Sequence, residues 1–128
     1  MTPAARALPS LRGCERGAVA AEFALVLSAL IVLILGVINA SLMIYSTATL
    51  HYAAEAAARC ATVSPSVCTS TYIATFPYAG VAMATRPTFV LSSQSCGNQV
   101  IATATYAFST GLVTVPVTIT ARACRPLG

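Results

Sequence analysis

One long apolar stretch dominates the hydrophobic pattern of this chain. No charged residue occurs between Glu22 and Glu55, and the 23 residues of 23–45 are almost all apolar. A helix needs about 20 such residues to cross the hydrocarbon core of a bilayer, whereas the apolar region of a cleaved secretory signal has only about 7–15. The pattern therefore predicts a retained transmembrane helix over about 23–45, and a cleaved signal is the weaker interpretation.

The flanks of the apolar stretch predict its orientation and its continuation. Three Arg residues precede it, and only Arg59 follows it closely. Because positive residues favour the cytoplasmic side, we expect a cytoplasmic N-terminus and an extracytoplasmic C-terminal part. The Ala-rich stretch 48–61 contains no Gly or Pro, which favours one continuous helix over 18–61 that ends before Pro65.

The remainder of the chain, 62–128, is predicted to form a small extracytoplasmic β-rich domain. Alternating β-branched and aromatic residues predict three strands there, joined at the last turn by a hairpin connection that contains Gly111. Pro116 cannot donate to a ladder and is expected near a strand start or on an edge. A short helical piece is expected around 72–76 or 79–84. The predicted fold is α+β: a long N-terminal transmembrane helix, then an antiparallel sheet with strands at 88–93, 99–108 and 115–124.

Composition argues against most soluble functions. Hydrophobic residues make up 57% of the chain and charged residues 8%, against about 25% charged in ordinary soluble proteins. The only titratable cluster is His51, Glu55 and Arg59, spaced by four along the helix, and we interpret it as a solvated helix face. We therefore expect no enzymatic activity, cofactor, metal site or small-molecule substrate, and the seven Arg residues form no stripe that would indicate nucleic-acid binding.

The start of the apolar helix carries a recognisable motif. Gly17 is followed by four small or apolar residues, then Glu22 and the aromatic Phe23. This order resembles the processing site of type IV prepilins, and Glu followed by an aromatic residue resembles the Tad (tight-adherence) branch, although Phe does not directly follow Gly as in the commonest type IV pattern. The resemblance implies that a prepilin peptidase cuts between Gly17 and Ala18, which would remove a cytoplasmic leader, 1–17.

Glu22 has a physical interpretation beside this resemblance. A carboxylate in a spanning helix costs ~2.5–3.5 kcal/mol near the bilayer centre and less near an interface, so such a residue usually has a partner. In pilin-like proteins the partner is the amino terminus of a neighbouring subunit, which here would be that of Ala18. Alternatively, Glu22 is an interfacial residue favoured by the dipole at the helix N-terminus.

The wider sequence is similar to TadE-like proteins, most of all to short four-cysteine members from Gram-negative bacteria. The similarity rests on the motif at Gly17 and on 53–61, 96–97 and 118–126. It implies a minor pseudopilin that takes part in assembly of a Tad (Flp) pilus for surface adherence and biofilm formation. Phe23 stands where the major Flp pilins typically have Tyr, and those very short pilins lack an outer domain; both differences favour a minor component.

The resemblance also implies partners and a location. The partners would be the prepilin peptidase, other pilus or pseudopilin subunits, the inner-membrane assembly platform and the lipid bilayer. The protein would be a single-pass inner-membrane protein with a periplasmic C-terminal domain. Whether it enters the pilus, and there primes, caps or decorates it, stays open. Two alternatives are an uncleaved single-pass protein whose periplasmic domain binds a partner, and a secreted adhesive subunit cleaved late in the apolar run.

The cysteines predict two disulfides in the outer domain. Cleavage after Gly17 would remove Cys14 and leave four cysteines on the extracytoplasmic side, where thiols oxidise. Four cysteines allow three connectivities. A hairpin turn centred at Thr110 would place Cys96 opposite Cys124, because paired residue numbers in an antiparallel hairpin have a constant sum. The expected bridges are therefore Cys96–Cys124 and, across a short loop, Cys60–Cys68.

Overall fold

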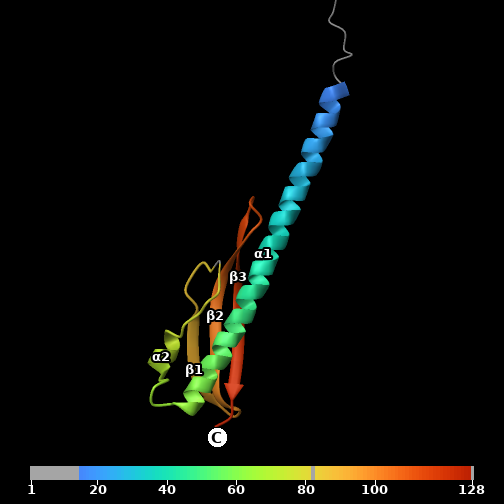
Figure 1. Cartoon of the computed structure of the whole chain (residues 1–128). Coiled ribbons are helices and arrows are strands. Elements are labelled where there is room, and N and C mark those ends of the chain that lie inside the picture. Colours follow the sequence, from blue (N-terminus) through green and yellow to red (C-terminus); the bar gives the residue numbers. More distant parts are fainter. Residues whose placement is uncertain (1–14, 82, 128) are drawn as a thin grey trace, which may run out of the picture. The chain divides into compact units, whose positions relative to one another are not determined.

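A computed structural model describes residues 15–81 and 83–127 of the chain. Cys14 and most of the predicted leader, 1–17, lie outside these residues. The described residues form one long helix, one short helix and a three-stranded sheet (Figure 1). This arrangement confirms the predicted α+β fold. The elements are α1 (Glu15–Val63), α2 (Ser70–Ala74), β1 (Thr88–Gln94), β2 (Gly97–Ser109) and β3 (Thr114–Arg125).

Helix α1 runs without interruption for 49 residues. It begins three residues before the predicted start and ends at Val63, because Ser64 precedes Pro65 and is therefore disfavoured in the helical conformation. The contacts divide the chain after Ile34, so that α1 from Leu35 onward belongs to the same compact unit as the sheet. The second part of the helix is thus a structural element of the outer domain.

The sheet is antiparallel, with β2 in the centre and β1 and β3 at its edges. Each predicted strand is present and extends by no more than two residues beyond either predicted end. Pro116 is the third residue of the edge strand β3, as expected for a residue that cannot donate a ladder hydrogen bond.

The predicted hairpin register was wrong by three positions. Ser109 pairs with Thr114, so the hairpin is centred between Gly111 and Leu112 instead of at Thr110. Gly111 has a φ of +86°, which a glycine adopts readily, and the Thr110 N–H donates to the Val113 carbonyl oxygen across the loop (3.1 Å). The turn geometry fixes the register, and alternation within the strands could not locate the centre of the connection.

Burial explains why the observed register is the stable one. It pairs Ala102 with Ala121 and Ala104 with Ile119, and these four side chains are all buried. The predicted register would have set Ala102 opposite Thr118, an exposed polar residue. Matching the two apolar faces therefore favours the observed alignment.

Two disulfides hold the outer domain together, Cys60–Cys68 and Cys96–Cys124, with Cα–Cα distances of 5.7 and 6.3 Å. Cys124 pairs with Gln99 in the ladder, so Cys96 does not lie opposite it as the sequence argument assumed. Cys96 lies instead in the turn between β1 and β2, and its bridge fastens this turn to the end of β3.

Gly97, at the start of β2, allows the backbone of this turn to lie against the end of β3. Its φ is +117°, and a β-carbon added there would collide with the carbonyl oxygen of Arg125. Only glycine combines this backbone conformation with so close an approach.

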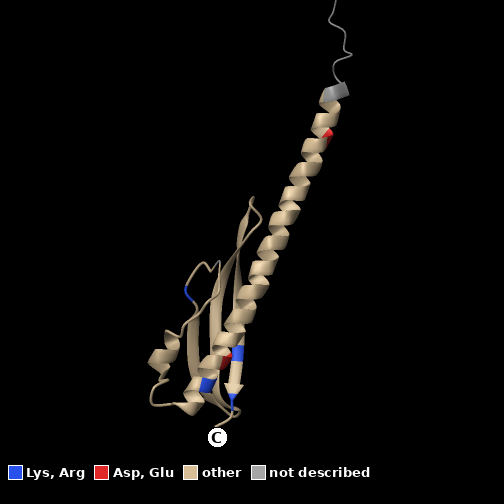
Figure 2. Cartoon of the chain, in the orientation of Figure 1, with Lys and Arg blue, Asp and Glu red and all other residues tan. Residues whose placement is uncertain are grey.

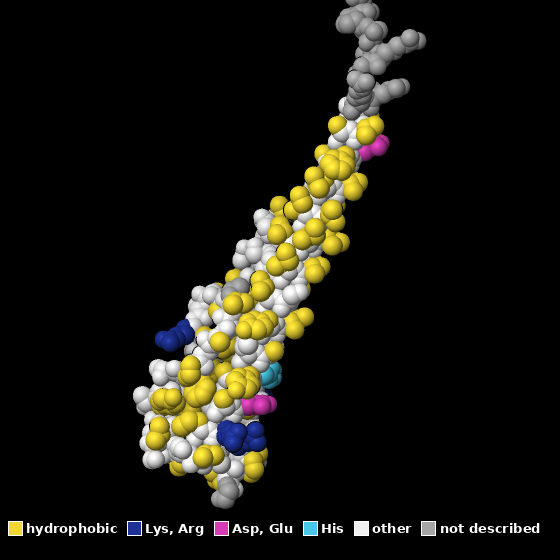
Figure 3. Space-filling view, in the orientation of Figure 1, with side chains coloured by type: hydrophobic (Ala, Val, Ile, Leu, Met, Phe, Trp, Pro, Cys, Tyr) yellow, Lys and Arg dark blue, Asp and Glu magenta, His cyan; other side chains and the backbone are white. Residues whose placement is uncertain are grey.

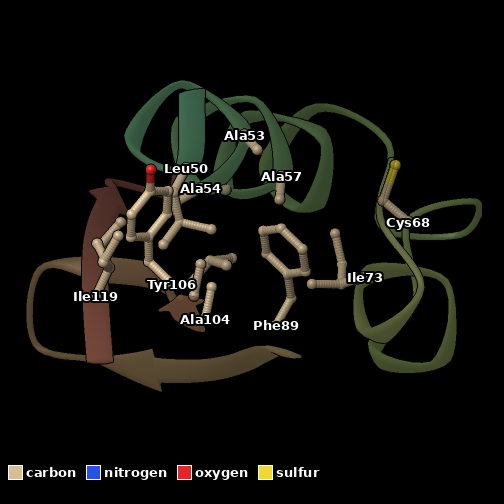
Figure 4. Close-up of a cluster of buried hydrophobic side chains, with 14 residues drawn as sticks. Leu50, Ala53, Ala54, Ala57, Cys68, Ile73, Phe89, Ala104, Tyr106 and Ile119 are labelled. Carbon is tan, nitrogen blue, oxygen red and sulfur yellow. The ribbon is translucent and has the colours of Figure 1, made fainter. Parts of the chain in front are cut away.

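The core lies between one face of the sheet and the second part of α1 (Figure 4). The helix contributes a stripe of mostly small side chains at helical spacing: Leu50, Ala53, Ala54, Ala57, Ala58 and Ala61. The sheet contributes larger side chains toward them, chiefly Phe89, Tyr106 and Ile119. Large side chains therefore fill the space that the alanines leave, and the opposite helix face, with its charged residues, stays exposed.

The segment between α1 and β1 contains only one short helix. Thr69 caps α2, because its side-chain oxygen accepts a hydrogen bond from the N–H of Tyr72, and Ile73 is the buried residue of this helix. Helix α2 starts two residues before the first predicted position, 72–76. The second, 79–84, was wrong where it is described: Met83 instead forms a bridge with Tyr106 of β2.

We predict that peptide mapping of the unreduced protein will give the disulfide connectivity of the structure. Digestion after aromatic residues should release Cys60 and Cys68 within one peptide, because Tyr52 and Tyr72 flank them. Cys96 and Cys124 should appear on two linked peptides, since Tyr106 and Phe108 separate them. Either of the other two connectivities would join all three peptides and would contradict the structure.

Candidate processing and membrane segment

The predicted processing residues lie in the first turns of α1. Gly17 is the third residue of the helix. The N–H groups of this first turn have no intrahelical acceptor, and helix ends unwind readily. The peptide bond after Gly17 is therefore among the easiest in the helix to expose. Ala18 and Glu22 are four residues apart and share one helix face, and both are exposed, as is Phe23. All four residues are therefore accessible in the isolated chain.

The first part of α1 is apolar and exposed around its whole circumference. Among the described residues, this is the one helix long and apolar enough to cross a membrane, with a most apolar 18-residue window of mean hydropathy 2.7 and no residue of that window buried. Figure 3 shows the hydrophobic side chains that cover it on the visible face. Water is a poor environment for such a surface, which makes the helix a candidate membrane span.

The Ser hydroxyls of the apolar stretch donate to carbonyl oxygens of their own helix. The Ser28 hydroxyl donates to the Leu25 carbonyl oxygen (2.8 Å), and the Ser41 hydroxyl donates to that of Val37 (2.9 Å). Hydrogen bonds of this kind lower the cost of placing a hydroxyl in lipid, because no water is available there as a partner. The Ser residues are therefore compatible with a spanning helix.

Asn39 joins α1 to the β2–β3 hairpin, a role that the sequence did not reveal. Its Nδ2 donates to the Leu35 carbonyl oxygen of its own helix (3.1 Å), and its Oδ1 accepts from the N–H of Ser109 (3.4 Å). Its main-chain carbonyl oxygen also accepts from the hydroxyl of Tyr106 (3.1 Å). A polar residue in an apolar helix was the only signal available, and it left open whether the partner was local or distant.

A second contact joins α1 to the segment before β1. The Ser46 hydroxyl donates to the Val81 carbonyl oxygen (2.8 Å), and the Tyr78 hydroxyl donates to the carbonyl oxygen of Ser46 (2.9 Å). Ser46 is the one polar residue among the buried set of the described chain. Its partners lie more than 30 residues away, which is why sequence reasoning missed it.

The cluster of His51, Glu55 and Arg59 is exposed on the helix face that points away from the sheet core. In residues 15–81 and 83–127, no three or more His, Cys, Asp or Glu side chains come together as a metal site would require. The nearest hollow is shallow and is lined by Tyr52, Glu55, Ala56, Arg59 and Arg125. The geometry is that of a solvated helix face.

These features define a class of protein: a membrane-type N-terminal helix with a small, disulfide-linked sheet domain packed on its second part. A family model described as TadE-like protein matches residues 17–59, which is most of α1. This match confirms the resemblance to the TadE-like family and indicates a protein associated with the Tad pilus. Searches of curated proteins and of solved structures gave no significant match.

We predict that Tyr106→Phe lowers the stability of the outer domain by ~1 kcal/mol, because it removes a hydrogen bond from a fully buried side chain to Asn39. For a domain of this size the melting temperature should fall by about 4–8 °C. Thermal unfolding of the full chain in detergent, followed by circular dichroism, measures the change.

Tyr72→Phe is the matched control, because Tyr72 is exposed and should leave the melting temperature nearly unchanged. Equal melting temperatures for the two variants would contradict a stabilising contact between the hairpin and α1.

Proposed function

We propose that the protein is a minor pseudopilin of a Tad (Flp) pilus system, processed by a prepilin peptidase after Gly17. It would sit in the inner membrane with a periplasmic outer domain and take part in assembly of a pilus for surface adherence. Its partners would be the peptidase, other pilus or pseudopilin subunits and the assembly platform.

The observation that carries this proposal is the position of the motif at the head of an exposed apolar helix. The family match begins at Gly17, the residue that would precede the cut. Glu22 and Phe23 follow at the expected spacing, and the next helical turns are apolar on every side. A processed chain would therefore start with Ala18 and present this helix to lipid or to neighbouring helices.

The charge of Glu22 supports an assembly role. Around it, α1 offers exposed apolar neighbours such as Val19, Phe23 and Val26. A carboxylate in such surroundings is costly without a partner, and the amino group that cleavage creates at Ala18 has the opposite charge. Pairing Glu22 of one subunit with Ala18 of the next would fix the axial offset between adjacent helices.

The helix also keeps an apolar face beside the outer domain. At the level where one side of α1 packs on the sheet, Val37, Ile38, Ile44 and Tyr45 remain exposed on the other side. Apolar surface that the chain itself does not cover is suited to packing against other helices. This face would extend the contact between subunits along α1 past Ile34.

Processing can be read from the intact mass of the protein isolated from its native membrane. We predict a 111-residue chain that begins at Ala18 and gains about four hydrogens on reduction, as expected for two disulfides. A Gly17→Val variant should keep the full length, because a branched side chain replaces the residue before the cut.

Gly36→Val is the control for this experiment. Neither glycine has another atom within 4 Å of an added β-carbon, so both sites have room for a side chain to begin, and the Gly36 variant should be processed like the wild type. A full-length wild-type mass would overturn the proposal in favour of an uncleaved single-pass protein. A soluble product without Glu22 would instead indicate a secreted subunit.

The role of Glu22 is tested by Glu22→Ala. We expect normal insertion into the membrane but at least about a tenfold loss of incorporation into the pilus or its assembly complex, because a buried pair that loses one partner is destabilised by ~3–5 kcal/mol. Fractionation of membranes and of sheared pili measures both quantities.

Glu55→Ala is the matched control, since Glu55 is also exposed on α1 but lies beside the outer domain. It should insert and assemble like the wild type. Normal incorporation of the Glu22 variant would rule out the pairing.

A further inference from the structure

The tip of the β2–β3 hairpin, Gly111–Val113, is apolar and uncovered. Leu112 is 80% exposed and Val113 62% exposed, and Val115, which follows in β3, is 49% exposed. Leu112, the most exposed of the three, buries little of its surface within its own chain. Its apolar area is therefore available to a partner.

The hairpin tip lies beside α1 at the point where the helix enters the outer domain. A β-carbon at Gly111 would lie 3.1 Å from a methyl group of Leu35. The N–H of Ser109, directly before the loop, donates to Oδ1 of Asn39, which lies one helical turn after Leu35. In the sequence, the apolar residues 17–34 directly precede Leu35, the residue of α1 that the hairpin tip lies against.

The hairpin tip carries no charge, and Arg86 lies further along the sheet, between Ala84, whose N–H donates to the Thr105 carbonyl oxygen, and Thr88, which pairs with Thr103. No charged residue occurs from Pro87 to Ala121, and the ribbon of the hairpin carries none near its tip (Figure 2). Arg122 and Arg125 pair with Ile101 and Asn98, at the end of the sheet away from the hairpin turn. The far end of the sheet, with its two Arg residues, is thus suited to water, and the uncharged hairpin tip to a lipid surface.

The loop also satisfies most of its own polar groups. The Thr110 N–H donates to the Val113 carbonyl oxygen (3.1 Å), the Gly111 N–H to the Ser109 hydroxyl (3.3 Å) and the Val113 N–H to the Thr110 hydroxyl (3.4 Å). Entering the lipid headgroup layer therefore strips few backbone donors of a partner. An irregular loop would not be stable deep in the hydrocarbon core, which restricts the hairpin tip to the interfacial layer.

We infer that the hairpin tip inserts into the interfacial layer of the bilayer, with Leu112 and Val113 at its apolar boundary, and so marks the level where α1 leaves the membrane. In the processed chain the hydrocarbon span would then be 18–34, which is 17 residues or about 26 Å long, at the lower end of the usual range. It lies closer to the N-terminus than 23–45. The inference rests on the membrane anchoring in the proposed function.

Tryptophan reporters can test this placement, because the chain contains no Trp. Three single variants of the full chain, Leu30→Trp, Leu112→Trp and Val90→Trp, would be reconstituted into vesicles of phosphatidylcholine and phosphatidylglycerol. All three positions are exposed, so the substitutions do not disturb the core. Val90 is the water control, since its partner Ile101 lies roughly 27 Å along β2 from Ser109.

We expect the Leu112→Trp emission to shift to shorter wavelength and to lose intensity with lipids brominated near the headgroup. The Leu30→Trp emission should be quenched by lipids brominated deeper in the chain. The Val90→Trp emission should respond only to iodide in the aqueous phase.

Failure of the inference about the hairpin can be distinguished from failure of the membrane anchoring. If Leu30→Trp senses lipid while Leu112→Trp behaves like Val90→Trp, the anchor stands and the inference about the hairpin is overturned. If Leu112→Trp is shielded from both iodide and brominated lipid, a second copy covers the hairpin tip, and the inference is again overturned. If Leu30→Trp does not sense lipid, the membrane anchoring fails and the inference fails with it.

Discussion

Helix α1 carries apolar side chains around its whole circumference as far as Ile34, and from Leu35 it packs one face on a sheet. The first part is stable only where lipid or other helices replace water, whereas the second part finds its apolar partner within the chain. The sheet depends on the second part of this helix for its core. The outer domain has no complete core without residues such as Leu50 and Ala54, which the helix supplies.

Because the helix contributes mostly alanine to this core, its apolar area is modest. The sheet compensates with Phe89 and Tyr106, and the two disulfides restrict the unfolded chain at the ends of α1 and β3. The polar contact of Asn39 with the hairpin adds a fixed point at the other end of the sheet. The outer domain is therefore held to α1 along its length by packing, and near both ends by specific contacts.

Much of this architecture could be predicted because its signals are local. The apolar run, the alternation in the strands and Ser64-Pro65 each act over a few residues, so they indicated the helix, the sheet and the helix end. The hairpin register could not be predicted, since it depends on the turn at Gly111 and on matching Ala102 with Ala121 across the sheet. The geometry assumed for Cys96 and Cys124 was wrong for the same reason.

In the candidate site, too, local features could be predicted and long-range contacts could not. The sequence alone determined the motif from Gly17 to Phe23 and the apolar character of the helix after it, because both are properties of consecutive residues. Only the tertiary structure decided that α1 joins the outer domain at Leu35, that Asn39 holds the hairpin and that Leu112 at the hairpin tip is left exposed. These features join residues about 70 positions apart, and no local pattern encodes such a contact.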